Sequence, residues 1–156
     1  KSNFSGLVPS PGEFEERDRV ILGRLSEAPK KASKFLDECK LREGLAAVVE
    51  LARDGNLYLS ENEPWHTIKT DPARARATMF VCAQIVRTLA ILLAPFVPNT
   101  AQSIWSQVGL LTRVSDARWD EAGKPSLEEG HPIGNPTPVF KKITDDQIKQ
   151  YTMQVT

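Results

Sequence analysis

The chain has little of what supports a disulfide framework, a metal site or a membrane span. Its 156 residues include two cysteines and two histidines, and no two of them lie at the short spacing of a zinc site. Because Cys39 and Cys82 are far apart in a chain without a secretory hydrophobic segment, we expect two buried thiols in a cytoplasmic protein. The longest apolar stretch, around residues 88–97, is well short of the ~20 residues that cross a bilayer. No membrane partner is expected.

The chain also lacks a surplus of charge of either sign. Lysine and arginine together number 20, as do aspartate and glutamate. Binding of RNA or DNA through bulk positive charge leaves a strongly basic composition, so any nucleic-acid site must be a local patch, and no DNA partner is indicated. The hydrophobic fraction of 40% is enough for the core of one folded domain.

Recognisable catalytic motifs are missing too. The sequence contains no glycine-rich phosphate loop, no nucleophile elbow and no paired histidines one helical turn apart. A thiol and base pair of Cys39 or Cys82 with His66 has no sequence feature that brings the groups together. We therefore expect no catalytic residues, no metal ligands and no enzymatic activity in this chain.

What the sequence does contain is apolar residues at the spacing of amphipathic helices. Residues 14–39 predict a helix with one buried stripe. Pro29 should kink this helix or split it, with Ser26 as the cap of the second piece.

Further helices are predicted downstream. A second helix over residues 41–59 would bury Leu41, Leu45, Val48 and Ala52, although Gly55 weakens the pattern. Pro64 fits the first turn of a short segment over 65–69, and Asp71 followed by Pro72 is the order that starts a long helix. That helix reaches Leu93, and a shorter one covers 101–108.

Beyond Leu111 the composition changes to scattered proline and glycine without periodicity. Four apolar residues, Ile133, Val139, Phe140 and Ile143, should tether this tail to the bundle, and a last short helix is predicted over 147–154. The sequence thus predicts an all-α fold, an antiparallel bundle of about four or five helices with an extended C-terminal tail packing back on it. Residues 1–111 form the bundle, and residues 112–156 belong to the same domain.

The stretch over residues 55–69 crowds polar groups, two aromatic residues and a proline at a helix junction. In one interpretation Trp65 covers the end of the bundle with Tyr58 packed below it. In the other, the Trp65 indole is a platform for an unstacked RNA base. The cations that could then meet phosphates are His66, Lys69, Arg74 and Arg76.

Several motifs here resemble the anticodon-binding domain of methionyl-tRNA synthetase, a class I aminoacyl-tRNA synthetase. They are Gly55-Asn56-x-Tyr58, Glu63-Pro64-Trp65-x-x-x-Lys69, and the helix ending Leu92-Leu93-x-Pro95-Phe96-x-Pro98. The tail from Gly130-His131 to Lys142-Ile143 resembles the segment that closes that domain. The resemblance covers nearly the whole chain, in order.

The resemblance implies a function. The parent enzyme would be a methionine-tRNA ligase that uses ATP with Mg in a catalytic domain, and this domain would read the CAU anticodon. Trp65 matches the tryptophan on which an anticodon base stacks. Pro64 matches the residue that fixes the entry of that segment, and Asn56 and Tyr58 match positions that organise the junction beneath it. The implied partners are methionine tRNA and the catalytic domain of the same chain.

By the same resemblance, the first helix of the domain is truncated. Residues 1–4 look like its last turn, and the family's Asn and Arg anticodon determinants would lie upstream of Lys1. A fragment without the catalytic domain would be inactive as a ligase and need no cofactor. Two alternatives remain open at this stage: a helical structural or protein-interaction module, and the anticodon-binding domain of a related class I synthetase.

Overall fold

The computed structural model describes residues 4–140 and 143–144. Within them the chain forms five α-helices and two short 3-10 turns, and the remaining β-type contact is an isolated bridge between Leu7 and Pro132. The helices are α1 (Glu16–Asp37), α2 (Leu41–Asn62), α3 (Pro64–Thr70), α4 (Pro72–Leu93) and α5 (Pro98–Gln107), and the turns are η1 (Val114–Asp116) and η2 (Trp119–Glu121). The predicted all-α bundle is confirmed.

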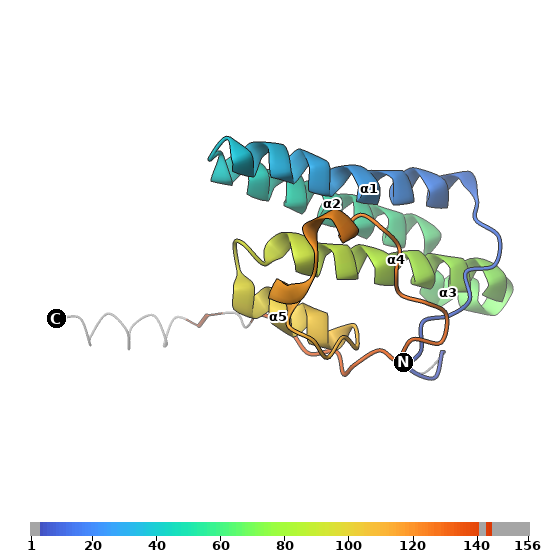
Figure 1. Cartoon of the computed structure of the whole chain (residues 1–156). Helices are drawn as coiled ribbons and strands as arrows, with labels where there is room; N and C mark the ends of the chain where they lie inside the picture. The colour runs from blue at the N-terminus through green and yellow to red at the C-terminus, as the bar shows by residue number, and fades with distance from the viewer. Residues whose placement is uncertain (1–3, 141–142, 145–156) are drawn as a thin grey trace.

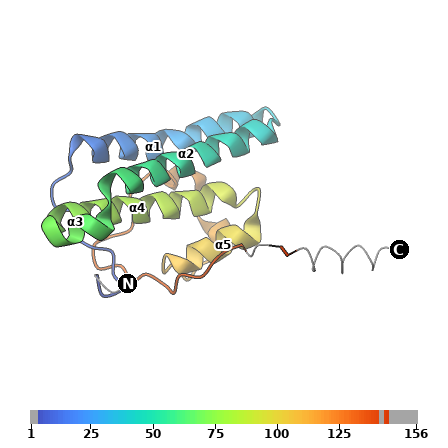
Figure 2. The same ribbon diagram turned by 180° about the vertical axis from the view of Figure 1, so that it is seen from behind.

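The long helix α4 is the centre of the bundle. It contacts α1, α2, α3, α5 and η1, and Figure 1 shows α1 and α2 as an antiparallel pair on one side of it and α5 on the other. Figure 2, the view from behind, places the short helix α3 at the end of the bundle, where α2 turns into α4. The core between these helices is formed by Leu25, Val48, Leu51, Val81 and Leu92, each at most 2% exposed.

By length and composition alone, α4 is apolar enough to cross a membrane. Most of its apolar residues are instead buried or partly buried inside the bundle, with Val86 an exposed exception, and it carries Arg74, Arg76 and Arg87. This is the pattern of the core helix of a bundle.

Of the kink or split predicted at Pro29, the split is wrong, because α1 runs unbroken from Glu16 to Asp37. A proline deprives the carbonyl four residues earlier of its helical donor. That carbonyl belongs to Leu25, and the backbone at Gly123 lies against this turn, so closely that a Cβ there would stand 3.2 Å from the Leu25 oxygen. Trp119 Nε1 also donates to the Pro29 carbonyl at 3.2 Å. The tail therefore packs over the turn in which Pro29 leaves a carbonyl without its helical donor. Ser26 lies inside α1 and does not cap a second helix.

The face that α2 buries differs from the predicted one. Leu41 and Leu45 are exposed, at 63% and 37%, and the buried residues are Gly44, Ala47, Val48, Leu51, Tyr58 and Asn62. Small residues bring α2 close to its neighbours: a Cβ at Gly55 would stand 3.1 Å from Ile85 Cγ2 on α4. Gly55 thus marks a close helix contact, and α2 continues through it.

The tail packs back on the bundle, as predicted, but through other residues than expected. Val139, Phe140 and Ile143 are exposed, and only Ile133 of the predicted tethers is partly buried. The buried anchors are Val114, Ala122 and Leu127. Polar groups of α4 fix Ala122 and Leu127, and Gln102 of α5 accepts from Val114 N at 2.8 Å. No apolar pattern could indicate these contacts. The helix predicted over 147–154 lies outside the described residues.

Three side chains of α4 hold the tail. Arg87 Nη1 donates to the Glu121 and Lys124 carbonyls at 3.3 and 3.4 Å. Gln84 Nε2 donates to the Leu127 carbonyl at 2.7 Å, and its Oε1 accepts from the Ser126 and Leu127 amides at 3.0 and 3.1 Å. Thr88 Oγ1 donates to the Ala122 carbonyl at 2.6 Å.

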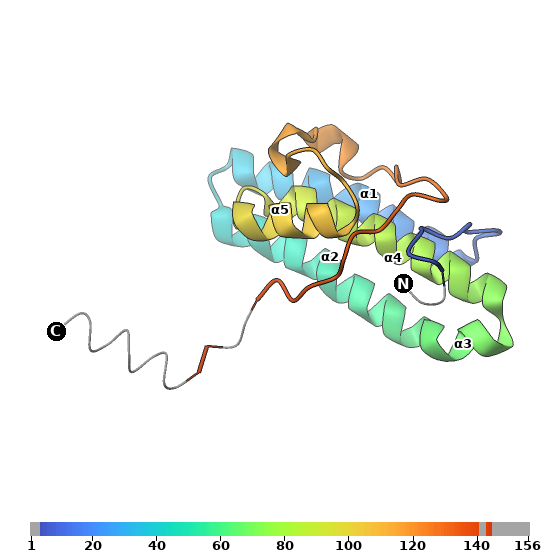
Figure 3. The ribbon, with the colours of Figure 1, turned by 90° about the horizontal axis from the view of Figure 1, so that it is seen from below.

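Farther along, the tail meets the N-terminal segment. Val8 N donates to the His131 carbonyl and Gly130 N donates to the Val8 carbonyl, each at 2.8 Å. Figure 3 shows this meeting beside α4.

The two cysteines lie in different surroundings. Cys82 is partly buried on α4, and burial raises the pKa of its thiol to about 12. Cys39, predicted to be buried, is exposed in the turn between α1 and α2, where its φ of 57° lies in the left-handed region. Its position in a tight turn of an antiparallel helix pair accounts for the exposure.

Candidate nucleic-acid interface

The predicted site lies where α2 ends, α3 crosses the end of the bundle and α4 begins; we call this region the junction. The chain leaves α2 at Glu63, whose φ of 40° and ψ of 57° are left-handed. Pro64 follows as the buried first residue of α3, a position that suits proline because no helical donor is needed there. After seven residues α3 ends, and the Asp71 side chain caps α4 by accepting from Arg74 N at 3.0 Å. These local signals place α3 as the sequence predicted.

Trp65 projects from the first turn of α3. The residue is 50% exposed, in contrast to Trp105, which is 5% exposed in the core. The His66 ring stands edge-on to the indole, with centroids 6.2 Å apart and planes at 64°. An indole held half in solvent on a short helix offers a face on which a planar base can stack.

Exposed basic side chains lie on both α3 and the start of α4. His66 and Lys69 lie on α3, with Lys69 one helical turn from Trp65 and therefore on the same side. Arg76 is exposed on the first turns of α4. This arrangement can bring positive charge to a phosphate backbone whose base rests on the indole.

Arg74, expected to meet phosphates, is placed elsewhere by the structure. Its side chain is 10% exposed and all three guanidinium nitrogens are hydrogen-bonded inside the protein. Nη1 and Nη2 bond the Asp18 carboxylate at 2.6 and 2.7 Å, while Nε and Nη2 bond Asn62 Oδ1 at 3.0 and 2.7 Å. Arg74 is thus the centre of a buried polar cluster.

Tyr58 and Asp18 complete this cluster, which we call the Asp18 network (Asp18, Tyr58, Asn62 and Arg74). The Tyr58 hydroxyl donates to Asp18 Oδ1 and accepts from Arg74 Nη2 at 3.2 Å. Asp18 Oδ2 also accepts from Glu15 N at 2.9 Å. Asp18 itself is fully buried. The network joins α1, α2 and α4 directly below the point where α3 begins.

The ionisation of the network follows from these contacts. Burial alone would raise the pKa of the Asp18 carboxyl, but hydrogen bonds from Arg74, Tyr58 and the Glu15 amide bring its pKa below the ordinary value. Burial, together with the Asp18 carboxylate, raises the pKa of Tyr58. The network therefore contains a buried carboxylate, a guanidinium ion and a neutral phenol.

The sequence indicated part of this arrangement. Tyr58 lies buried below the junction as a member of the Asp18 network, whereas Asn56 is exposed on α2 and stands outside the network. Asp18 and Asn62 were missed. A polar residue inside an amphipathic helix looks like a surface residue in the sequence, and only the fold shows that these two are buried.

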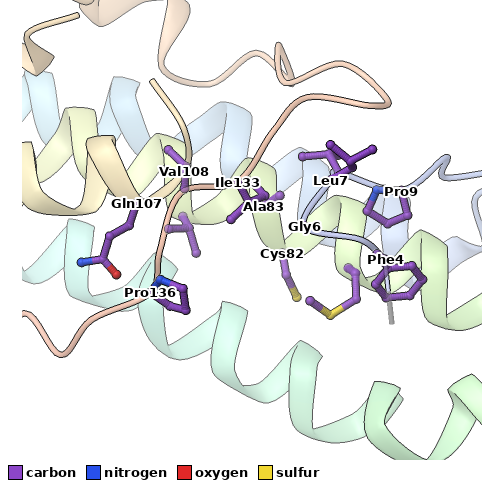
Figure 4. Close-up of a pocket in the computed structure, with 13 residues that line it drawn as sticks. Phe4, Gly6, Leu7, Pro9, Cys82, Ala83, Gln107, Val108, Ile133 and Pro136 are labelled. Carbon is purple, nitrogen blue, oxygen red and sulfur yellow. The ribbon is translucent and has the colours of Figure 1, made fainter. Parts of the chain in front are cut away.

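Two surface hollows lie along α4. One, of about 400 Å³, runs between residues 10–15 and the start of α4 and contains carboxylates beside Arg76. The other, of about 280 Å³, is apolar and is formed by the N-terminal segment, α4, the end of α5 and the tail. Figure 4 shows Phe4, Leu7 and Pro9 at one end of it and Gln107 and Pro136 at the other. Among the described residues, no group of three or more His, Cys, Asp or Glu could hold a metal.

Comparison with known families shows what kind of domain carries this junction. The family model described as the anticodon binding domain of methionyl tRNA ligase matches residues 8–156. The chain belongs to this family. The resemblance to the methionine enzyme is thus confirmed, over both alternatives that the sequence left open.

Individual relatives agree with the family assignment. The methionine–tRNA ligase of Metallosphaera sedula is 38% identical over 143 residues, covering 92% of this chain and 25% of the relative. That of Salinibacter ruber is 36% identical over 158 residues, covering 94% of this chain and 22% of the relative. The domain therefore spans about a quarter of the length of the curated relatives it matches.

Solved structures show the same fold. The apo form of methionyl-tRNA synthetase from Mycobacterium tuberculosis matches with a TM-score of 0.83 and 29% identity, over 91% of this chain and 29% of that one. The same enzyme bound to methionyl-adenylate matches with a TM-score of 0.81 and 30% identity, over 89% of this chain and 28% of that one. The anticodon-binding domain thus keeps its fold at moderate identity.

Proposed function

We propose that this anticodon-binding domain reads the CAU anticodon of methionine tRNA by stacking one unpaired base on Trp65. The observation that carries the proposal is the half-exposed indole on α3, a short helix held at both ends. Pro64 fixes the direction in which α3 leaves α2. Base–aromatic stacking supplies binding energy without selecting among bases, because every base has an aromatic face.

The phosphate backbone is bound by the exposed cations of the junction. Lys69 on α3, one helical turn from Trp65, and Arg76 on the first turns of α4 supply positive charge in a chain whose net charge is zero. The exposed His66 ring beside the indole offers a further hydrogen-bonding group. Arg74 contributes through the Asp18 network instead of through a direct contact. The exposed side chain of Asn56 is a further candidate for a contact with the loop.

The activity of the parent protein follows from the relatives. We propose that the domain works as part of a cytoplasmic methionine–tRNA ligase. A separate catalytic domain would use ATP with magnesium to attach methionine to the tRNA whose anticodon is bound here. The domain's own part in that reaction is selection of the tRNA, and it needs no cofactor.

A titration with an anticodon stem-loop tests the proposal. The CAU loop and a loop of scrambled sequence are each added to residues 1–156 while tryptophan fluorescence is followed. Trp105 is buried and Trp119 half-buried, so quenching by the loop reports chiefly on Trp65. We expect quenching that weakens steeply as salt rises, since phosphate contacts release counterions. A preference for CAU would show that groups beside the stacked base read base edges within this chain.

Two variants of one residue sharpen the test. Trp65→Ala should weaken binding roughly 5- to 150-fold, the equivalent of one lost stack, whereas Trp65→Phe keeps an aromatic face and should lose less. Phe140→Ala removes another exposed aromatic side chain, distant in sequence from α3, and should leave binding unchanged. Equal binding by Trp65→Ala and the wild type would refute the stacking role.

A further inference from the structure

The two residues that flank α3 are hydrogen-bonded to each other. Asn62 is the last residue of α2 and Arg74 lies in the first turn of α4, twelve positions later. Asn62 Oδ1 accepts from Arg74 Nε at 3.0 Å and from Nη2 at 2.7 Å. All of α3, including Trp65, lies between these two residues. The hydrogen bonds therefore close the segment that carries the indole into a ring.

The Asn62 end of this link is itself fixed. Asn62 is 8% exposed, and its Nδ2 donates to the Tyr58 carbonyl at 2.7 Å, which sets the orientation of the amide. The backbone carbonyls of Asn62 and Glu63 accept from Thr67 Oγ1 at 3.3 and 3.2 Å. A residue in the middle of α3 is thus bonded back to the end of α2.

The Arg74 end is fixed by charge. The guanidinium reaches the buried Asp18 carboxylate with two nitrogens and still presents Nε and Nη2 to Asn62. Only a planar fork with several donors can hold two partners in this way, whereas a lysine ammonium acts as a single point of charge. The link thus depends on arginine and not merely on a cation.

We propose that Asn62 and Arg74 are positioning residues that hold α3, and with it Trp65, in the orientation that receives the base. This inference rests on the function proposed above. A platform held in place before RNA arrives loses less conformational freedom on binding, and this raises affinity without any new contact to the ligand. Neither residue needs to touch the RNA for its loss to weaken binding.

Two substitutions remove the link from opposite sides. Asn62→Ala deletes the acceptor. Arg74→Lys keeps a positive charge opposite Asp18 but lacks the fork that reaches Asn62. Thr88→Val serves as the matched control, because it breaks a buried hydrogen bond of the same α4 helix at the Ala122 carbonyl, away from α3.

The readouts separate positioning from folding and from RNA binding. Amide exchange measures the protection of His66, Thr67 and Asp71, whose amides bond within α3 and its flanks. Acrylamide quenching is measured on the fluorescence of Trp65 alone. That fluorescence is the intensity of each variant minus the intensity of the same variant carrying Trp65→Phe. Both are measured without RNA, and stem-loop affinity is measured afterwards.

We expect Asn62→Ala and Arg74→Lys to lose protection in α3 while the amides around Leu25 and Val48 keep theirs. CAU stem-loop affinity should fall about 3- to 10-fold in each variant, less than the loss expected for Trp65→Ala. The double variant should bind no more weakly than the weaker single one, because both remove one link. Unchanged α3 protection in both variants would overturn the positioning role. Wild-type binding that does not depend on Trp65 would instead overturn the proposed function.

Discussion

Arg74 and Asp18 form a two-point ion pair in which the carboxylate is fully buried and the guanidinium nearly so. The two residues come from different helices, 56 positions apart. Such a pair joins α1 to α4 at the end of the bundle where α3 begins. Its main effect appears when one partner is removed, because the other is left as an uncompensated charge away from water.

Asp18→Ala should therefore destabilise the domain by about 3–5 kcal/mol. Denaturant unfolding followed by circular dichroism measures the change. Glu16→Ala, on the same helix, is the control: that carboxylate is exposed and lies 3.8 Å from Arg19, so its loss should change stability by less than about 0.5 kcal/mol. Similar losses in the two variants would contradict the burial of the Asp18 charge.

The contribution of Asp18 should depend on pH in one direction. Its folded-state pKa lies below the unfolded value of about 3.9, so the stabilisation is complete above that pH. As the pH falls further, the unfolded state takes up its proton first and the stabilisation is lost. The stability difference between the wild type and Asp18→Asn should therefore be constant from pH 7 to 5 and shrink below about pH 4. A difference that grows on acidification would have the wrong sign.

Two helical glycines should respond differently to alanine. Gly23 is exposed on α1 and a Cβ there meets nothing within 4 Å, so Gly23→Ala should stabilise the fold by about 0.5–1 kcal/mol through helix propensity. Gly55→Ala gains the same propensity, but its Cβ would stand 3.1 Å from Ile85 Cγ2. We expect its gain to be reduced or reversed. Thermal unfolding measures the stability change in both variants. Equal stabilisation would contradict this expectation, because it would show that α2 and α4 move apart at Gly55 without cost.

Gln84→Leu should release the tail while leaving the bundle folded. The substitution removes the partners of the Leu127 carbonyl and of the Ser126 and Leu127 amides, and each unsatisfied buried group costs about 1–3 kcal/mol. The tail can avoid that cost by leaving the surface. Limited proteolysis should then cut near residues 112–130 much faster than in wild type, with Val86→Ala on the same helix as the control. Unchanged cleavage would mean that other contacts hold the tail.

The sequence predicted those parts of the fold that depend on local signals. Pro64, Asp71 and Pro72 fix the ends of α3 and the start of α4 by backbone chemistry alone, and the structure has them there. Apolar periodicity failed in α2, where close approach through Gly44 and Ala47 outweighs the burial of Leu41 and Leu45. Periodicity counts hydrophobic side chains and cannot register the absence of a side chain as a packing feature.

The candidate site was predictable to the same extent. Trp65 and its exposed cations follow from residue type and from the resemblance to the family. The different positions of Arg74 and Arg76, two residues apart, could not be predicted in this way. Arg74 is buried against Asp18, whereas Arg76 is exposed. Which of two neighbouring cations turns inward is decided by a carboxylate on another helix, and that contact is absent from any local pattern.

The meeting of the N-terminal segment with the tail sets an order of events in folding. Each helix can form within about a microsecond from contacts close in sequence. The bonds that join Val8 to Gly130 and His131 unite residues from opposite ends of the described chain, and closing so large a loop in an unfolded chain is entropically costly. Once α1 to α5 have assembled, the folded bundle already brings these two segments near each other, and the entropic cost of closing the loop is smaller. We therefore expect the bundle to assemble first and this contact to close last, as a separate and slower kinetic phase.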